Sequence, residues 1–382
     1  MENIESKSLL KKRLIVFALV AYGISFLMMI PMYIGKKNGM DLTQIVDAQM
    51  CSPAAGVALG YLMFYKGEKR VPKMFMIVLV INYVIQLVLG LLSIFANPFT
   101  ADDVINLAQA AGPASDDVAA LAGSQSVLKL QQIYLLIGEL ALIGCSILLW
   151  IGYFTAGKER RKFAGLSRNN EGKGALLILL FVGLYCLRIF VPMIAEGLLT
   201  NTMREYGEMY AGILKNPLFY LSIISLPINY PLLIIAFLGE EYGWRHFLQP
   251  IMQKKFGMKL GVILLGVVWG LWHIPVDTLF YTEDSIPQMI IGQIITCVAI
   301  GIFFGYAYLK TNNIWVPVCM HFLNNNLIPI LTGEFTAEVL EDQHVPWEYL
   351  IEILIIDFLV FCLFIFAKEY KEKKKTKEAL DA

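Results

Sequence analysis

Apolar residues along this chain gather in about ten blocks, each close to the roughly 20 residues that a helix needs to cross a bilayer core. No ten-residue alternation suggests a membrane barrel, and open strands cannot satisfy their backbone groups in lipid. The pattern therefore predicts an all-α polytopic membrane protein with about ten transmembrane helices. The expected spans are 14–34, 48–65, 74–95, 130–154, 175–195, 218–240 with a helical continuation towards 252, 259–276, 288–309, 314–331 and 348–367.

Composition supports this class. Hydrophobic residues make up 57% of the 382 residues and charged residues 16%, against about 45–50% and 25% in soluble domains. The six cysteines lie inside apolar blocks and form no CxxC pair. We therefore expect them to be small packing residues rather than disulfides or thiolate metal ligands.

Charge differs between the two kinds of connecting segment. Lysine and arginine are concentrated in segments that would share one side of the membrane, namely 7–13, 66–73, 158–173, 254–259, 310 and 368–377. The segments on the other side are rich in acidic residues, namely Asp102, Asp103, Asp116, Asp117, Glu334, Glu338, Glu341 and Asp342. The positive-inside rule then predicts that both termini are cytosolic. We expect an integral membrane protein of a bacterial cell membrane.

We divide the chain by its chemistry, because ionisable residues cluster only in the later spans. Residues 1–170 would form an N-terminal membrane region of about four helices, without an assigned role. Within it, the long external segment 97–128 shows no chemistry and has room for a short surface helix. Residues 171–367 would form a second helix bundle that carries the clustered ionisable residues, and residues 368–382 a charged cytosolic tail.

Ionisable side chains inside a membrane are costly and mark functional sites by default. Glu240, Glu241 and Arg245 occur together towards the end of one apolar block. Glu241 and Arg245 are four residues apart and can pair on one helix face. Glu240 points about 100° away from that face and has no partner of opposite charge on the helix. Its unpaired carboxylate is therefore suited to take a proton from water. The alternative is an ion pair that anchors the membrane edge.

Two histidines and an amide follow on later spans. The turn near Lys254 to Gly257 lies midway between 240 and 273, so an antiparallel hairpin would bring Glu240 and His273 to one level. His321 and Asn325 are four residues apart and share a helix face. The alternative for this pair is a hydrogen bond between helices. Together these groups could activate a water molecule and stabilise an oxyanion, which is the chemistry of amide hydrolysis.

Other observations narrow the choice. The chain contains no His-Glu-x-x-His zinc motif and no Gly-x-Ser-x-Gly nucleophile elbow. Glu139, Arg188 and Asp357 each lie near the centre of a span. We expect Arg188 to pair with one of these acids and to lock the bundle. The alternative is that the three residues line a polar path.

The residues Glu240-Glu241-x-x-x-Arg245, Trp269-x-x-x-His273 and His321-x-x-x-Asn325 resemble, in this order, the three motifs of the CPBP (Abi) family. This family includes the type II CAAX prenyl endopeptidases and bacteriocin-processing proteins. The resemblance covers about residues 218–330, the motif core of the expected catalytic bundle. The family's second motif often begins with Phe, where this chain has Trp269.

The resemblance implies an intramembrane endopeptidase. Glu240 would be the general base, and His273 would hold and polarise the water. His321 and Asn325 would bind the oxyanion. Glu241 and Arg245 would support them.

The resemblance leaves a metal cofactor open. The side chains of Glu240, His273 and His321 could form a zinc set with one open position, as the family's metalloprotease label suggests. A metal-free glutamate mechanism has also been proposed for the family, and we favour it.

We expect the partners to be the lipid bilayer and a peptide or lipidated protein substrate, with no nucleic acid. Cleavage is expected near the cytosolic face. In a bacterium, a leader peptide, a bacteriocin or a signalling peptide would be suitable substrates. The alternatives are a non-catalytic scaffold or bacteriocin-immunity protein of the same fold, and a transporter, although no inverted repeat is present.

Overall fold

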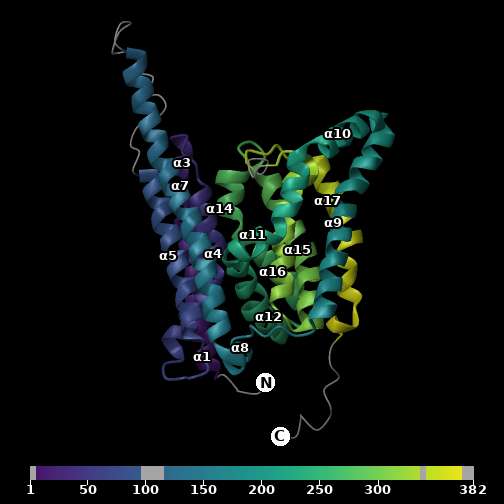
Figure 1. Ribbon diagram of the computed structural model, residues 1–382. Coiled ribbons are helices and arrows are strands. Elements are labelled where there is room, and N and C mark those ends of the chain that lie inside the picture. The colour runs from purple at the N-terminus through teal and green to yellow at the C-terminus, as the bar shows by residue number, and fades with distance from the viewer. Residues whose placement is uncertain (1–5, 96–115, 336–340, 372–382) are drawn as a thin grey trace.

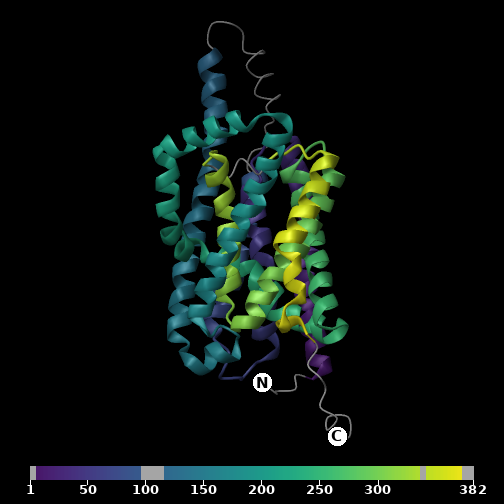
Figure 2. The same cartoon turned by 90° about the vertical axis from the view of Figure 1, so that its right-hand side faces the viewer.

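A computed structural model describes residues 6–95, 116–335 and 341–371, and every regular element in these ranges is a helix. Figures 1 and 2 show that most of the helices run side by side along one direction. The start of α1 and the last described residues lie at the same end of this bundle (Figure 1). The prediction of an all-α polytopic membrane protein is confirmed.

The first part of the chain forms four long helical elements. Its helices are α1 (Lys7–Ala18), α2 (Ser25–Leu27), α3 (Met29–Lys37), α4 (Thr43–Phe64), α5 (Lys73–Phe95), α7 (Asp116–Thr155) and the short α8 (Gly157–Phe163). A π-helical turn over Leu19–Ile24 joins α1 to α2, so the chain from Lys7 to Lys37 crosses as one interrupted helix. Of the expected external segment 97–128, residues 97–115 lie outside the described residues, and 116–128 belong to α7.

The second part contains the remaining helices. They are α9 (Glu171–Thr200), α10 (Met203–Lys215), α11 (Pro217–Glu241), α12 (Gln249–Phe256), α13 (Met258–Trp272), α14 (Ile274–Val276), α15 (Ile286–Thr311), α16 (Trp315–Thr332) and α17 (Trp347–Val360). A π-helical segment over Tyr242–Leu248 joins α11 to α12 without a break, and another over Asp277–Tyr281 extends α14. Two 3₁₀ turns, Cys362–Phe366 and Lys368–Tyr370, follow α17. The helix α10 lies across one end of the bundle (Figure 1).

Each of the ten expected spans coincides with a helix, and seven continuous helices in the described ranges are long and apolar enough to cross a membrane. The helices α4, α16 and α17 are not among the seven. The helix α4 is less apolar than the seven because it lies inside the bundle. Its polar residues Gln44, Gln49 and Ser52 are buried against other helices. A helix covered by protein needs less apolar surface than one covered by lipid.

Glycines set the distances between the helices that carry the motifs. A Cβ atom at Gly239 would lie 2.5 Å from the carbonyl oxygen of Met50 in α4, and one at Gly243 would lie 2.4 Å from the Cβ of Pro53. Between α13 and α15, a Cβ at Gly270 would lie 2.6 Å from the Cα of Ile294. Small residues allow membrane helices to approach this closely. The first two sequence motifs, on α11 and α13, are therefore held directly against neighbouring helices.

Hydrogen bonds also tie the first part of the chain to α13. The Trp272 indole donates to the carbonyl oxygen of Ala21 at 2.7 Å, and the Tyr22 hydroxyl donates to the carbonyl oxygen of Val268 at 2.7 Å. The Gln49 amide of α4 donates to the carbonyl oxygen of Trp272 at 2.9 Å. The first helices therefore help to position the helix that carries His273.

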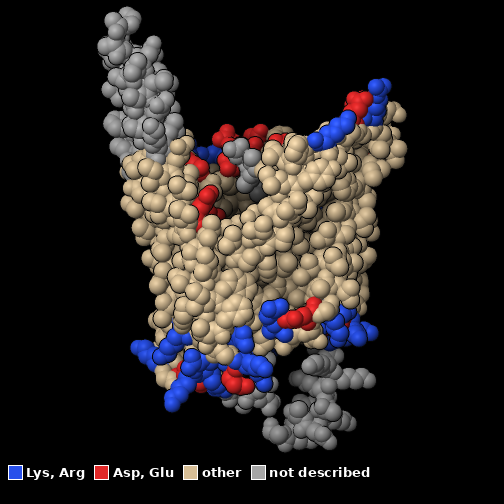
Figure 3. All heavy atoms as spheres, in the orientation of Figure 1, with Lys and Arg blue, Asp and Glu red and all other residues tan. Residues whose placement is uncertain are grey.

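Charged side chains separate to the two ends of the bundle. Lysine and arginine gather around α8 and α12, whereas acidic side chains surround a hollow at the opposite end (Figure 3). Tan surface without charge lies between them in this view, as expected for the part of a protein that faces hydrocarbon.

Candidate active site

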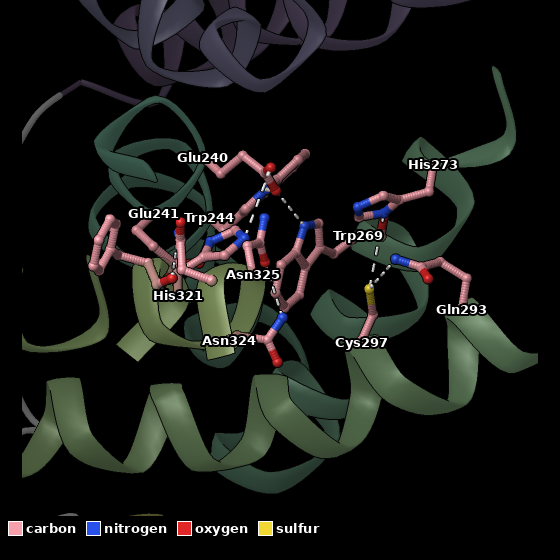
Figure 4. Close-up of polar contacts among 12 residues, drawn as sticks. Glu240, Glu241, Trp244, Trp269, His273, Gln293, Cys297, His321, Asn324 and Asn325 are labelled. Carbon is pink, nitrogen blue, oxygen red and sulfur yellow. Dashed lines mark hydrogen bonds and ion pairs between the residues drawn. The ribbon is translucent and has the colours of Figure 1, made fainter. Parts of the chain in front are cut away.

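Glu240 is anchored by indole groups on one side only. Its Oε2 atom accepts a hydrogen bond of 2.7 Å from Trp269 Nε1 and one of 3.4 Å from Trp244 Nε1, one turn further along the same helix. Its Oε1 atom lies 3.9 Å from His321 Nε2 (Figure 4). The indoles thus fix one oxygen and leave the other available to a small ligand.

The antiparallel hairpin that brings Trp269 to Glu240 depends on Gly257. This residue lies between α12 and α13 with φ of 85°, a conformation that side chains rarely allow. The turn occurs where the sequence predicts it, so Glu240 and the segment from Trp269 to His273 lie at the same level. The prediction that the Glu240 and His273 motifs lie next to each other is confirmed: Trp269 contacts Glu240, and Glu240 and His273 line the same cavity.

Glu241 belongs to a buried chain of charged groups next to Glu240. Its Oε2 atom accepts from Arg245 Nε at 2.8 Å, and its Oε1 atom lies 3.0 Å from His321 Nδ1. The side chains of Glu241 and Arg245 are both 0% exposed. The Arg245 guanidinium also lies 4.7 Å from the centre of the Trp269 ring, a cation–π distance. Glu241 and Arg245 therefore position His321 and Trp269 from behind.

The hydrogen bonds of His273 define which ring nitrogen is free. Its Nδ1 atom lies 2.9 Å from the carbonyl oxygen of Trp269, and a carbonyl can only accept. Nδ1 therefore carries the proton, and Nε2 is an acceptor when the ring is neutral. Cys297 Sγ lies 3.8 Å from the same Nδ1 atom. His273 can thus hold one hydrogen of a water molecule through Nε2.

His321 is placed between the two glutamates. The Glu241 carboxylate accepts from Nδ1, and the Glu240 carboxylate faces Nε2. With a carboxylate at each ring nitrogen, both nitrogens can be donors, as they are in the imidazolium form.

Asn325 is oriented by its neighbour Asn324. The Asn324 side-chain amide donates to Asn325 Oδ1 at 2.9 Å, so the Asn325 NH₂ group remains free to donate towards the site. The backbone of Asn324 is held in turn by the Tyr185 hydroxyl, which donates to its carbonyl oxygen at 2.9 Å.

One cavity of about 210 Å³ connects these groups. Glu240, His273, His321, Asn324 and Asn325 all line it, whereas Glu241 and Arg245 are buried behind it. Its wall extends from this polar floor to the first turns of α15 and α17, at the acid-rich end of the bundle, where Figure 3 shows the surface hollowed. The wall therefore reaches towards the end of the bundle opposite the basic segments, and the expected cleavage near the cytosolic face stays a prediction.

A metal site does not form in the described ranges as the side chains lie. No three side chains of His, Cys, Asp or Glu are close enough together there to hold an ion. Glu240, His273 and His321 surround the same space but are spread around it.

The sequence prediction grouped Glu240, Glu241, Arg245, His273, His321 and Asn325, and the structure brings all six together. The prediction assigned no role to Trp244 or Asn324, and it did not anticipate that the Trp269 indole donates to Glu240. A signal for two of them exists in hindsight, because Trp244 lies one turn from Glu240, and Asn324 adjoins Asn325.

Arg188 pairs with Asp357, one of the two acids considered for it. Arg188 Nε lies 2.6 Å from Asp357 Oδ1, while Glu139 lies on an exposed position of α7. The pair joins α9 to α17.

A buried carboxylate, two histidines and an amide at the floor of a cavity within a membrane helix bundle define a class of site suited to hydrolysis inside the membrane. Comparison with known proteins finds a similar family. Residues 216–327 match the model of the type II CAAX prenyl endopeptidase Rce1-like family, so this segment is similar to CAAX-type proteases.

One curated relative is the CAAX prenyl protease 2 of Methanococcus maripaludis, which is 29% identical over 116 residues. The match covers 28% of this chain and 41% of the relative, so it spans less than half the length of either protein. No solved structure matches the chain.

The indole of Trp269 provides the first testable prediction. Trp269→Phe should keep the ring packing but remove the 2.7 Å hydrogen bond to Glu240. A hydrogen bond to a charged group contributes about 1.5–3 kcal/mol, so we expect kcat/KM for peptide cleavage to fall by about tenfold or more. Trp150→Phe is the matched control, since its indole donates to the carbonyl oxygen of Pro231 at 3.0 Å, away from the cavity. Equal activity of both variants would show that the Glu240 hydrogen bond is dispensable.

Proposed function

We propose that this protein is an intramembrane endopeptidase that hydrolyses a peptide bond of a membrane-associated or lipidated peptide with a water molecule activated by Glu240. One observation carries the proposal. The free Oε1 of Glu240, the Nε2 atoms of both histidines and the Asn325 amide surround one cavity inside the membrane bundle. The match of residues 216–327 to CAAX-type proteases supports it.

In the first step, a water molecule held by Glu240 Oε1 and His273 Nε2 attacks the carbonyl carbon of the scissile bond. Glu240 takes one proton as the new C–O bond forms. That proton then passes to the amide nitrogen while the C–N bond breaks, which releases an amine and a carboxylic acid. Because indoles hold only Oε2, proton transfer at Oε1 leaves the anchoring of Glu240 intact.

The negative charge that develops on the carbonyl oxygen needs donors that are already in place. His321 Nε2, when protonated, and the Asn325 amide are the donors nearest to this charge in our proposal. Glu241 holds His321 through Nδ1, and Asn324 holds Asn325 through Oδ1. Neither donor therefore has to reorient during the reaction.

The proposed mechanism requires no metal ion, in keeping with the spread of Glu240, His273 and His321 around the cavity. Elemental analysis of the purified protein tests this part. Stoichiometric zinc, with activity lost on chelation and restored on addition of zinc, would replace the metal-free mechanism with a metal-assisted one.

The activity itself is tested with purified protein and a library of quenched peptides, some of them lipidated. We expect one peptide bond to be cleaved, with oxygen from isotopically labelled water found in the new carboxylate. If no peptide is cleaved, and replacement of Glu240 leaves the cellular function unchanged, the protein is a non-catalytic scaffold of the same fold.

The position of the cavity mouth predicts the side from which the substrate enters. The loop 282–285 follows Tyr281, which lines the cavity, and lies at the end of the bundle opposite the basic segments, an end that the positive-inside rule places outside the cytosol. In intact cells, a membrane-impermeant maleimide should label Glu283→Cys, whereas Lys254→Cys should react only after the membrane is permeabilised. The wild-type protein gives the background from its six cysteines. The reverse labelling pattern would place the mouth in the cytosol.

A further inference from the structure

Arg188 extends from α9 into the wall of the cavity. Its Nε atom donates to Asp357 Oδ1 at 2.6 Å, and its Nη2 atom lies 3.1 Å from Thr296 Oγ1 and 3.4 Å from Asp357 Oδ2. These contacts use one N–H of Nε and both N–H groups of Nη2. They fix the plane of the guanidinium between α9, α15 and α17.

The Nη1 group of Arg188 has no partner among the described residues. The side chain is 15% exposed, and Arg188 lines the cavity. Two N–H groups in a fixed plane are therefore presented to whatever fills the cavity. The edge formed by Nε and Nη2 is occupied by Asp357, so Nη1 is the nitrogen that can still donate charge-assisted hydrogen bonds to a carboxylate oxygen.

Arg188 is also close to the hydrolytic groups. Its partner Thr296 is followed directly in α15 by Cys297, whose sulfur lies 3.8 Å from His273 Nδ1. The remainder of the wall on this side carries neutral polar and apolar side chains, namely Gln288, Met289, Gln293, Tyr349 and Ile353. Among the residues that line the described cavity, Arg188 alone has a permanent positive charge.

Asp357 balances the charge of Arg188 but does not occupy its outer edge. A lone arginine in this position would need a counter-ion to remain buried. With Asp357 in place, Arg188 has a counter-ion in the absence of substrate, and a substrate carboxylate can still accept hydrogen bonds from Nη1. Tyr349 and Gln293 add neutral donors nearby.

We propose that Arg188 Nη1 binds a carboxylate of the peptide substrate and thereby sets the distance between that carboxylate and the bond that Glu240 hydrolyses. This inference rests on the proposed peptidase function and assigns it a specificity-determining residue. The carboxylate is either the free C-terminus of the peptide or an acidic side chain close to the cleaved bond.

Three matched peptides distinguish these sources. A cleaved peptide is compared with its C-terminal amide and with a variant in which each acidic side chain is made neutral. We expect wild-type kcat/KM to fall by about tenfold to a hundredfold for the peptide that lacks the recognised carboxylate, as for the loss of a charged hydrogen bond. The peptide that is affected identifies the source.

The protein variants then assign the effect to Arg188. In Arg188→Gln, and in the double variant Arg188→Gln with Asp357→Asn, the preference for the carboxylate peptide should disappear. The double variant leaves no unpaired charge and so protects the fold. Because each ratio compares two peptides on one protein sample, partial unfolding cancels, and a purely structural role would lower both rates equally.

The outcomes separate this inference from the function on which it rests. If the wild type cleaves all three peptides equally well, or if the preference survives in the variants, Arg188 does not bind a substrate carboxylate, and the peptidase proposal stands. If the wild type cleaves no peptide at all, the proposed function fails first. The wild-type comparison alone decides the question if neither variant folds.

Discussion

Glu240→Gln is expected to abolish peptide hydrolysis while the protein remains folded. Glutamine has nearly the same shape, and its Oε1 can still accept the indole hydrogen bonds of Trp269 and Trp244. It cannot take a proton from water at neutral pH. General-base catalysis contributes typically 10²–10⁴-fold, so we expect kcat to fall by at least about a hundredfold. Peptide cleavage and thermal unfolding in detergent, measured on one preparation, test both parts of this expectation.

The control for this experiment is Glu139→Gln, which makes the same chemical change at an exposed position of α7. It should cleave at the wild-type rate. If Glu240→Gln also retained full activity, Glu240 would not be the base, and the proposed mechanism would be wrong.

Glu241→Gln is expected to destabilise the protein strongly, although the residue adjoins Glu240. The substitution leaves Arg245 without its charged partner at a position that is 0% exposed, and it weakens the hold on His321 Nδ1. Breaking a buried ion pair by changing one partner costs about 3–5 kcal/mol. The expected result is a clearly lower unfolding temperature in detergent and loss of activity as a consequence.

The chain offers a matched control for this second prediction. Glu208 and Arg204 form an ion pair with the same four-residue spacing and the same 2.8 Å distance, but at exposed positions of α10. Exposed pairs contribute little to stability, so Glu208→Gln should unfold at nearly the wild-type temperature. Equal unfolding temperatures for Glu241→Gln and the wild type would show that the buried pair contributes nothing to the fold.

These two neighbouring glutamates show how much the sequence could predict. The four-residue spacing placed Glu241 and Arg245 on one helix face, and the structure pairs them. The position of the turn near Gly257 was enough to bring Glu240 and the second motif to one level, because helix rise fixes height along an antiparallel hairpin. Local periodicity and spacing therefore predicted the composition of the site and its depth.

The partners of Glu240 were less predictable. Whether the Trp269 indole points towards a carboxylate depends on its rotamer and on the rotation of α13 about its own axis, and neither follows from spacing. The helix α10 was also missed, because its sequence has too few apolar residues to appear among the spans. The position of the cavity depends on how the helices pack against one another, and spacing along the chain does not predict that.

The close packing of α4 against α11 limits which residues can occupy the two helices. Gly239 and Gly243 fit against Met50, Cys51 and Pro53 with no space for even one added carbon. A larger residue on either helix would shift Glu240 relative to Trp269. At Gly239 the atoms in the way belong to the backbone of Met50 and Cys51, so no side-chain substitution on α4 can make room for a larger residue there. A chimera that grafts the matched segment 216–327 onto other membrane helices would have to carry the matching face of α4 with it.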